Sequence, residues 1–196
     1  LYKTEIFSGN PNRKVMMLSF DDYGSEDQVG KILNALTKYG AKASFFVNGP
    51  MFTYAPNAVK RIISEGHVLG IHSNNHDIFP KLTSDQIDND FCNFLSSSEK
   101  VVPGYQYKYF RFPYGSRNEQ SRWQVASWGL VNVMWSDTSG GVSAVSSYNE
   151  VVSRAANGKI ILMHMERQGD VEAIESIVIK LLQLGYSLES IETGLR

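Results

Sequence analysis

Two adjacent carboxylates end an apolar run near the start of the sequence. Residues 15–22 read Val-Met-Met-Leu-Ser-Phe-Asp-Asp, so Asp21 and Asp22 stand where a buried strand leaves the core. Neighbouring side chains on an extended strand point to opposite sides, and a buried carboxylate requires a partner such as a cation. The pair therefore predicts one carboxylate that binds a metal and a second one that acts as a base.

Three of the four histidines also follow predicted strands. His72 and His76 are four residues apart, a spacing that lets two imidazoles meet one ion, although two surface histidines are the commoner explanation of such a pair. Two histidines and one aspartate leave a zinc ion with an open position for water, which is typical of a hydrolytic site. We expect His164 to be a general acid or base, with a core histidine or a third ligand as alternatives. His67, at a strand entrance, is expected to be structural.

Two further polar residues follow predicted strands. Arg111 is expected to pair with a carboxylate and orient it, and the alternative is that it only caps backbone carbonyls. Pro113 stiffens the turn that follows, so the amide of Tyr114 can face a developing oxyanion. Asp137 is expected either to orient Arg111 or His164, or to be a turn residue before two glycines.

Aromatic residues after strand ends can stack on the faces of sugars. The sequence places five there: Tyr23, Phe52, Tyr54, Tyr114 and Trp135. Most aromatic side chains are packed against other residues, so packing is the alternative for each of them.

Strand-like apolar runs alternate with amphipathic helical stretches along the whole chain. Strands are expected at residues 15–22, 43–47, 67–71, 107–112, 130–135, 159–163 and 186–191, and Asp170 is expected to cap the last long helix. Crossover helices return the chain in the same direction, which predicts a parallel sheet, either open or closed into a barrel of fewer than eight strands. In both arrangements active sites lie at the C-terminal edge of the strands, where the candidate residues fall.

The composition of the 196 residues fits one domain (1–196) and excludes several classes of protein. Nineteen Lys and Arg balance twenty Asp and Glu without a block of like charge, which argues against a nucleic-acid surface or a polybasic membrane patch. No apolar run is long enough to span a bilayer. Cys92 is the only cysteine, which excludes an intrachain disulfide and an all-cysteine zinc site, and its helical position predicts a core residue.

Four motifs resemble those of the polysaccharide deacetylases of carbohydrate esterase family 4, which share the NodB homology domain. They are Ser-Phe-Asp-Asp (19–22), His-Ser-Asn-Asn-His (72–76), Arg-Phe-Pro-Tyr (111–114) and Leu-Met-His (162–164), in the order of the family. The resemblance implies a distorted (β/α)7-type barrel and a divalent metal, usually Zn²⁺, with Co²⁺ or another ion possible. It also implies hydrolysis of N-acetyl groups on amino sugars, or of O-acetyl groups in the xylan-acting branch.

The resemblance also implies a role for each matching residue. It assigns the base to Asp21, the metal ligands to Asp22, His72 and His76, the orientation of the base to Arg111, the oxyanion amide to Tyr114, the acid to His164 and the substrate pocket to Leu162, where we also expect Trp135. Two places depart from the family pattern. Tyr23-Gly24 stands where Gly-Pro is usual, and Gly140-Gly141 stands where the fourth motif ends in Asp-Trp, with Asp137 as a candidate substitute.

The first expectation for function is an extracytoplasmic deacetylase of N-acetylglucosamine in peptidoglycan. Chitooligosaccharide deacetylase and acetylxylan esterase follow, and a zinc-dependent amidohydrolase of small cyclic amides is a further possibility. A non-catalytic glycan-binding relative is the alternative from another class, motivated by the altered fourth motif. We expect a carbohydrate polymer or oligomer as substrate, no nucleic-acid partner and a monomer. Because the chain begins with Leu1 rather than Met, we expect a fragment whose signal or anchor lies outside it.

Overall fold

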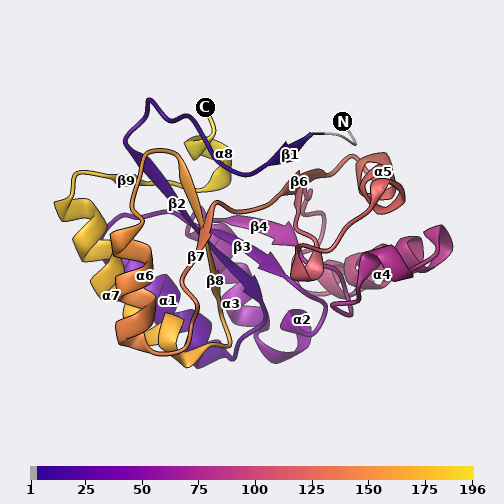
Figure 1. The fold of residues 1–196 in the computed structure, drawn as a ribbon. Helices are drawn as coiled ribbons and strands as arrows, with labels where there is room; N and C mark the ends of the chain where they lie inside the picture. The colour runs from indigo at the N-terminus through magenta and orange to yellow at the C-terminus, as the bar shows by residue number, and fades with distance from the viewer. Residues whose placement is uncertain (1–3) are drawn as a thin grey trace.

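The computed structural model describes residues 4–196 and shows parallel strands curled into a half-barrel (Figure 1). The strands are β1 (Glu5–Ile6), β2 (Val15–Asp22), β3 (Ser44–Val47), β4 (Val68–Ile71), β5 (Tyr109–Phe110), β6 (Val131–Val133), β7 (Asp137–Thr138), β8 (Lys159–His164) and β9 (Ser187–Leu188). Their order in the sheet is β1-β6-β5-β4-β3-β2-β8-β7, and β9 pairs with β2 beside this path. Every pair of these strands is parallel, so the predicted distorted barrel is confirmed.

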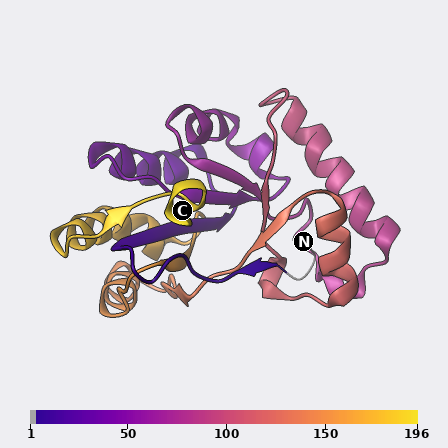
Figure 2. The same ribbon diagram turned by 90° about the horizontal axis from the view of Figure 1, so that it is seen from above.

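Helices follow most of the strands and cover the sheet. They are α1 (Glu26–Lys38), α2 (Met51–Tyr54), α3 (Pro56–Ser64), α4 (Ser84–Glu99), α5 (Glu119–Ser127), α6 (Ala144–Ser153), α7 (Gln168–Gln183) and α8 (Ile191–Gly194). Helices α1, α6 and α7 lie together at one end of the molecule, and α4 and α5 lie at the other end (Figures 1 and 2). Within residues 4–196, four helices start with a capping box, as Thr83 and Gln86 form at the start of α4.

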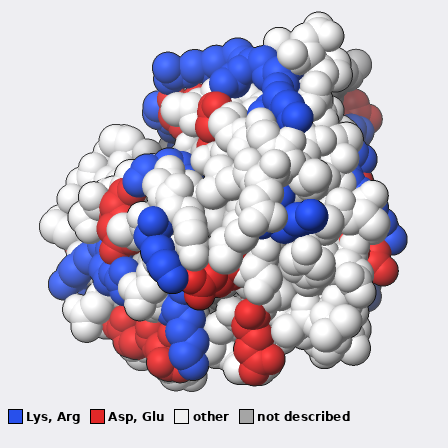
Figure 3. All heavy atoms as spheres, turned by 90° about the vertical axis from the view of Figure 1, so that its left-hand side faces the viewer, with Lys and Arg blue, Asp and Glu red and all other residues white. Residues whose placement is uncertain are grey.

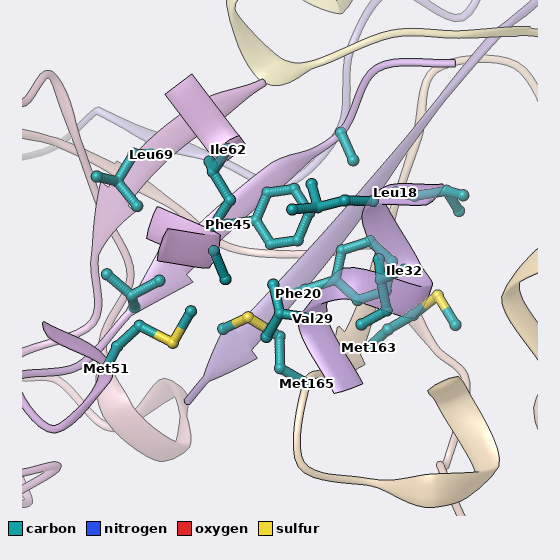
Figure 4. Packing of buried hydrophobic residues seen from close by; sticks show 14 of the residues in the cluster. Leu18, Phe20, Val29, Ile32, Phe45, Met51, Ile62, Leu69, Met163 and Met165 are labelled. Atoms are coloured by element: carbon teal, nitrogen blue, oxygen red, sulfur yellow. The ribbon is translucent and has the colours of Figure 1, made fainter. Parts of the chain in front are cut away.

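The core lies between the sheet and the helices, with β2 at its centre. Strand β2 pairs with β3, β8 and β9, and all of its residues except the last one are buried. Phe20 of β2 stacks on Phe45 of β3, with 5.2 Å between the ring centroids, and Leu18, Ile32 and Met163 surround them (Figure 4). Burying one such apolar side chain contributes about 1.5–3 kcal/mol to stability. The core therefore holds β2 rigidly up to the point where Asp21 and Asp22 leave it.

Two residues that the sequence placed in the wrong environment are Cys92 and Phe52. Cys92 is exposed. The buried face of α4 is formed by Ile87, Asp90, Phe91, Phe94 and Ser98, and Cys92 lies beside this stripe. Phe52 is buried in α2 and contacts Phe94 edge to face at 5.1 Å, so it is not available to a ligand. The short helix α2 itself was not predicted.

The surface described here carries charges of both signs. On the face shown in Figure 3, Lys and Arg side chains lie beside Asp and Glu side chains. Lys38 of α1 and Glu175 of α7 form one such ion pair of the described chain, at 2.6 Å. None of the helices in residues 4–196 is long and apolar enough to cross a membrane.

Candidate metal centre and active site

Parallel strands end at one edge of the sheet, and their register brings the candidate residues together. Asp21 on β2 lies opposite His164 on β8. The amide of Arg111 donates a hydrogen bond to the Ile71 carbonyl at 2.9 Å, so Arg111 and His72 leave β5 and β4 side by side. Residues that are up to 143 positions apart in the sequence therefore meet because the strands carrying them are parallel and adjacent.

Asp22, His72 and His76 form a cluster that can hold a metal ion. One ligand atom from each residue lies within 4.8 Å of the other two. The Nε2 atoms of the two imidazoles are 3.2 Å apart, and the Oδ1 atom of Asp22 lies 3.1 Å from Nε2 of His76 and 3.6 Å from Nε2 of His72. Two imidazoles and a carboxylate form the donor set of a catalytic zinc site with an open position.

The surroundings of the cluster fit a bound cation. The Nδ1–H group of His72 donates to the Arg111 carbonyl at 2.8 Å, which leaves Nε2 as the ligand atom. Burial lowers the pKa of His72 to about 3, so the ring is neutral and able to bind a metal at neutral pH. Oδ1 of Asp22 is buried and has no hydrogen-bond partner among residues 4–196. A buried carboxylate oxygen of this kind is costly unless a cation compensates its charge.

The backbone is strained at the same place. Four non-glycine residues in the described part of the chain have a positive φ: Asp22 (73°), Ser73 (67°), His76 (62°) and Tyr114 (58°). All four belong to the segments that form this site. The left-handed conformation costs a non-glycine residue about 1 kcal/mol or more, and such strain is found where the orientation of a side chain matters for function.

Asp90 of α4, which was not predicted from the sequence, holds the loop that carries the two histidines. Its carboxylate accepts hydrogen bonds from the amides of Asn74 at 2.8 Å and Asn75 at 3.1 Å, while the Ser73 hydroxyl accepts one from the His76 amide at 2.8 Å. The sequence did contain a signal, because Asp90 is a carboxylate on the apolar face of an amphipathic helix. A charge at such a position requires a buried partner.

Gly49 allows this loop to pack against the turn after β3. The Gly49 amide donates to the Asn74 carbonyl at 3.1 Å. A Cβ atom on Gly49 would clash with the side chain of Asn74 and lie 3.0 Å from its carbonyl, so a larger residue would require the loop to shift. The loop and the start of α2 therefore form one packed unit.

Asp21 is held by Arg111, which is fully buried. Nη1 of Arg111 donates to Oδ1 of Asp21 at 2.6 Å, and Oδ2 of Asp21 lies 3.7 Å from Nε2 of His72. Nε and Nη2 of Arg111 donate to the carbonyls of Val133 and Met134 at 2.9 and 3.0 Å, so it pairs with a carboxylate and also caps carbonyls. Burial raises the pKa of Asp21 to about 6, while the charge of Arg111 opposes the rise. Such a pKa suits a general base near neutral pH.

His164 faces the metal cluster from the opposite side. Its Nε2 atom lies 3.9 Å from Oδ2 of Asp22, and its Nδ1 atom is buried without a hydrogen-bond partner in residues 4–196. Burial, followed by the charge of Arg167, lowers the pKa of His164 to about 3. His164 lines the same cavity as Asp22, His72 and His76, so its ring points toward this cavity rather than into the core.

Asp170 positions the backbone of His164 and does not cap α7. The N-cap of α7 is Arg167, and Asp170 lies inside the first turn. The buried carboxylate of Asp170 accepts a hydrogen bond from the His164 amide at 2.9 Å and one from the Ser147 hydroxyl at 2.8 Å. The expected cap is therefore wrong, because the side chain is used to fix the end of β8.

Asp137 lies outside this group of residues. Its carboxylate pairs with Lys159 at 2.6 Å and with Arg154 at 3.6 Å, and it contacts neither Arg111 nor His164. Strand β7 pairs with β8, and neighbouring side chains on a strand point to opposite faces. Thr138 points into the cavity, so Asp137 points away from it. The expectation that Asp137 orients a catalytic side chain is not supported.

A cavity of about 300 Å³ joins the remaining candidates. Its lining consists of Asp21, Asp22, His72, His76, Phe112, Tyr114, Trp135, Thr138, Leu162, His164 and Arg167. Leu162 and Trp135 are therefore at the pocket, as expected, and the ring of Tyr114 packs on that of His76 at 4.5 Å. Arg167, which was not predicted, closes one side and donates from Nη1 to the Gly140 carbonyl at 3.1 Å.

Comparison with known proteins identifies the family. The model of a family described as polysaccharide deacetylase matches residues 8–133, which is more than half of the chain. The chain belongs to the polysaccharide deacetylases of carbohydrate esterase family 4. The family suggested by the sequence motifs is thereby confirmed.

Proteins named as peptidoglycan deacetylases are similar in sequence to this polysaccharide deacetylase chain. A peptidoglycan N-acetylglucosamine deacetylase of Bacillus cereus is 33% identical over 190 residues, which cover 91% of this chain and 67% of that protein. The peptidoglycan N-acetylmuramic acid deacetylase PdaC of Bacillus subtilis is 31% identical, and the match covers 93% of this chain but only 39% of PdaC. Curated relatives of the chain thus include proteins named for both sugars of peptidoglycan.

A family pseudoenzyme has a closely similar fold. A mutant with restored enzymatic activity of a carbohydrate esterase family 4 pseudoenzyme from Bacillus anthracis superposes on this chain with a TM-score of 0.90 at 25% identity. The superposition covers 100% of this chain and 72% of that one. The fold of the family is therefore compatible with both active and inactive members.

Proposed function

We propose that this chain is a metal-dependent hydrolase that removes N-acetyl groups from amino-sugar polymers, with the N-acetylglucosamine of peptidoglycan as its first substrate. The observation that carries the proposal is the triad of Asp22, His72 and His76 in one cavity with Asp21 and His164. A protein that only binds a glycan would not need a free carboxylate and an imidazole beside the ion, whereas a hydrolase needs them as base and acid. The donor set favours Zn²⁺, and Co²⁺ is the next candidate.

The residues of the chain divide the reaction between them. When bound, a divalent ion would polarise the acetyl carbonyl and lower the pKa of a water molecule. Asp21, kept in place by Arg111, accepts the proton of the attacking water through its Oδ2 atom. The amide of Tyr114, in a turn with fixed backbone, is the proposed donor to the oxyanion.

His164 gives a proton to the departing amine, which is too poor a leaving group as an anion. Its ring is neutral in the free protein, because burial and Arg167 lower its pKa. It therefore takes up a proton from solvent during turnover and passes it to the amine, while Asp21 returns the proton accepted from water to solvent. The negative charge that develops on the tetrahedral oxyanion favours this protonation, since opposite charges stabilise each other more strongly inside a protein than in bulk water.

The choice of peptidoglycan is supported by the names of the relatives and by the cavity. The Bacillus cereus relative, at 33% identity, is named for N-acetylglucosamine. A cavity of about 300 Å³ lies at the lower end of ligand sites, which suits an acetamido group with part of one sugar. We propose that the protein acts outside the cytoplasm, where this polymer lies. Chitin oligomers and acetylxylan are the alternative substrates.

The test is acetate release by the zinc-loaded protein on three polymers. We expect the highest kcat/KM on peptidoglycan and lower values on chitin oligomers and acetylxylan. A peptidoglycan in which only the muramic acid is N-acetylated tells which of the two amino sugars is the substrate, because a deacetylase of N-acetylglucosamine releases no acetate from it. Absence of acetate from every polymer, with the metal bound, would contradict the proposal.

A glycan-binding protein without catalysis is the second candidate. It is favoured by the buried Nδ1 atom of His164, which has no partner in the described chain, and by the likeness to a family pseudoenzyme. An acid that no carboxylate orients is a weaker catalyst. Binding of peptidoglycan fragments without acetate release, in metal-loaded protein, would favour this function.

A further inference from the structure

The exposed tyrosines gather at one edge of the molecule. Among residues 4–196, three tyrosines expose more than a third of their surface: Tyr23 (40%), Tyr54 (62%) and Tyr114 (67%). All three follow C-terminal ends of strands, where the metal cluster lies. The other described tyrosines are half-buried, wherever they lie in the fold. Large rings exposed together at one place mark a surface that binds a ligand.

Tyr23 and Tyr54 form a pair at the same edge of the sheet as the metal cluster, outside the lining of the cavity. Tyr23 is the residue after Asp22, and its ring lies 5.6 Å from that of Tyr54 at an angle of 30°. The turn before α2 is tied to the site, because the amide of Asn48 donates to the Asp22 carbonyl at 3.2 Å. Met51 and Phe52 anchor α2 in the core and leave Tyr54 at the surface. The pair is therefore exposed and also held in place.

The order of the strands places exposed rings on both sides of the histidines. Tyr114 follows β5, His72 and His76 follow β4, Tyr54 comes after β3, and Tyr23 follows β2. Because the sheet order runs β5-β4-β3-β2, the histidines lie between Tyr114 and the tyrosine pair along this edge. A polymer that crosses the edge would contact Tyr114, the metal cluster and then the pair.

We infer that Tyr23 and Tyr54 form a stacking platform for a second sugar ring, next to the sugar whose acetyl group faces the metal cluster. The apolar face of a pyranose covers an aromatic ring, as aromatic side chains bind flat partners by area rather than by charge. The platform rests on the proposed function, since it serves a glycan substrate. With this platform, the site binds at least two sugar rings of the polymer rather than one.

The experiment compares long and short substrates of the same sugar. We would measure kcat/KM of the zinc-loaded protein on N-acetylglucosamine oligomers of five and of two sugars. The variants are the double substitution Tyr23→Ala and Tyr54→Ala, the ring-conserving Tyr54→Phe, and Trp123→Ala as the matched control. Trp123 is an exposed aromatic residue on α5, with 56% of its surface exposed.

The platform predicts a specific loss for the longer substrate. In the double variant, the ratio of kcat/KM for five sugars to that for two should fall about threefold to tenfold. It should be unchanged in Trp123→Ala and largely kept in Tyr54→Phe. An unchanged ratio in the double variant would overturn the platform while leaving the proposed deacetylase intact.

If the wild type releases no acetate, the proposed function is contradicted, and the platform is tested by a binding measurement. Calorimetry with the five-sugar oligomer then decides. Tighter binding to the wild type than to the double variant, by the same factor, supports the platform. Equal binding, or none, overturns it.

Discussion

The two ends of β4 each carry a buried histidine, and the two rings have different surroundings. His67 precedes the strand, and its Nδ1 atom accepts a hydrogen bond from the Ala43 amide at 3.1 Å, with Phe45 edge-on at 5.6 Å. His72 follows the strand and lies 3.2 Å from the Nε2 atom of His76. Burial lowers the pKa of both, to about 4 and about 3. A buried histidine with a lowered pKa is therefore not by itself a site, and the second ligand within reach makes the difference.

The same contrast holds for the backbone at the two edges of the sheet. Before β3 and β4, at the strand entrances, the left-handed positions are occupied by Gly40 and Gly66, which adopt them without strain. At the exits, left-handed positions carry Asp22 and His76, whose side chains cannot be given up. Among residues 4–196, left-handed strain at non-glycine residues is thus confined to the edge that carries the candidate site.

The largest effect is expected from Asp21→Asn. An amide cannot accept the proton of the attacking water, so kcat/KM should fall by about 10²–10⁴. Asn can keep a hydrogen bond to Arg111, and Asp22 is untouched, so the metal content should not change. Acetate release and elemental analysis of the same sample check both points. Full activity, or loss of the metal, would mean that the two carboxylates have exchanged roles.

Asp90→Asn tests whether the Asp90 carboxylate, which binds the amides of the loop between His72 and His76, positions the two histidines. An amide oxygen replaces only one of the two acceptors that bind the loop amides, so the metal affinity should fall about tenfold to hundredfold. Asp88→Asn is the matched control on α4, because its carboxylate accepts from Gln124 and Trp128 at 2.6 Å, away from the loop. Competition with a zinc chelator measures the affinities. Equal losses in both variants would reduce Asp90 to a purely structural residue.

The lowered pKa of His67 predicts that stability depends on pH. Metal binding should not depend on this residue, because His67 lies at the other end of β4. Its pKa in the folded state, about 4, lies below the unfolded value of 6.5. As the pH falls below 6.5 the unfolded chain binds the proton first, so stability that is present above pH 6.5 is lost between pH 6.5 and 4. Between pH 7 and 5 the wild type should lose about 2 kcal/mol more than His67→Gln. Urea unfolding at both pH values measures this, and parallel curves would contradict it.

The smallest effect is expected from Asp137→Asn. Its ion pairs with Lys159 and Arg154 lie partly in solvent, so the free energy of unfolding should change by less than about 1 kcal/mol. Acetate release should stay at the wild-type rate, because the carboxylate points away from the cavity. A loss of activity above tenfold would return Asp137 to the catalytic group.

The sequence predicted the parts of the molecule that repeat a simple pattern. The bounds of β2 agree with the predicted 15–22, because an apolar run buried on both sides needs no tertiary information. The convergence of Asp22 with His72 was also predictable, because both follow parallel strands. Patterning of this kind carries most of the fold and the ligands of the metal cluster.

The rest depends on which way single side chains point. Strand β7 has two residues, too few to show an alternation that would have placed Asp137 on the outer face. Cys92 and Asp90 are two positions apart on α4, and Asp90 lies on the face of Ile87 and Phe94, whereas Cys92 lies beside it. The roles of the supporting carboxylates Asp90 and Asp170 were missed because their partners are backbone amides, which no residue type in the sequence marks.

The metal content of matched histidine variants tests the central claim most directly. Elemental analysis would be made on the wild type, His72→Gln and His67→Gln, each purified with excess zinc and then dialysed. The account predicts about one divalent ion per chain in the wild type and in His67→Gln, and almost none in His72→Gln. Equal metal content in His72→Gln and His67→Gln, or none in the wild type, would contradict a metal centre built from Asp22, His72 and His76.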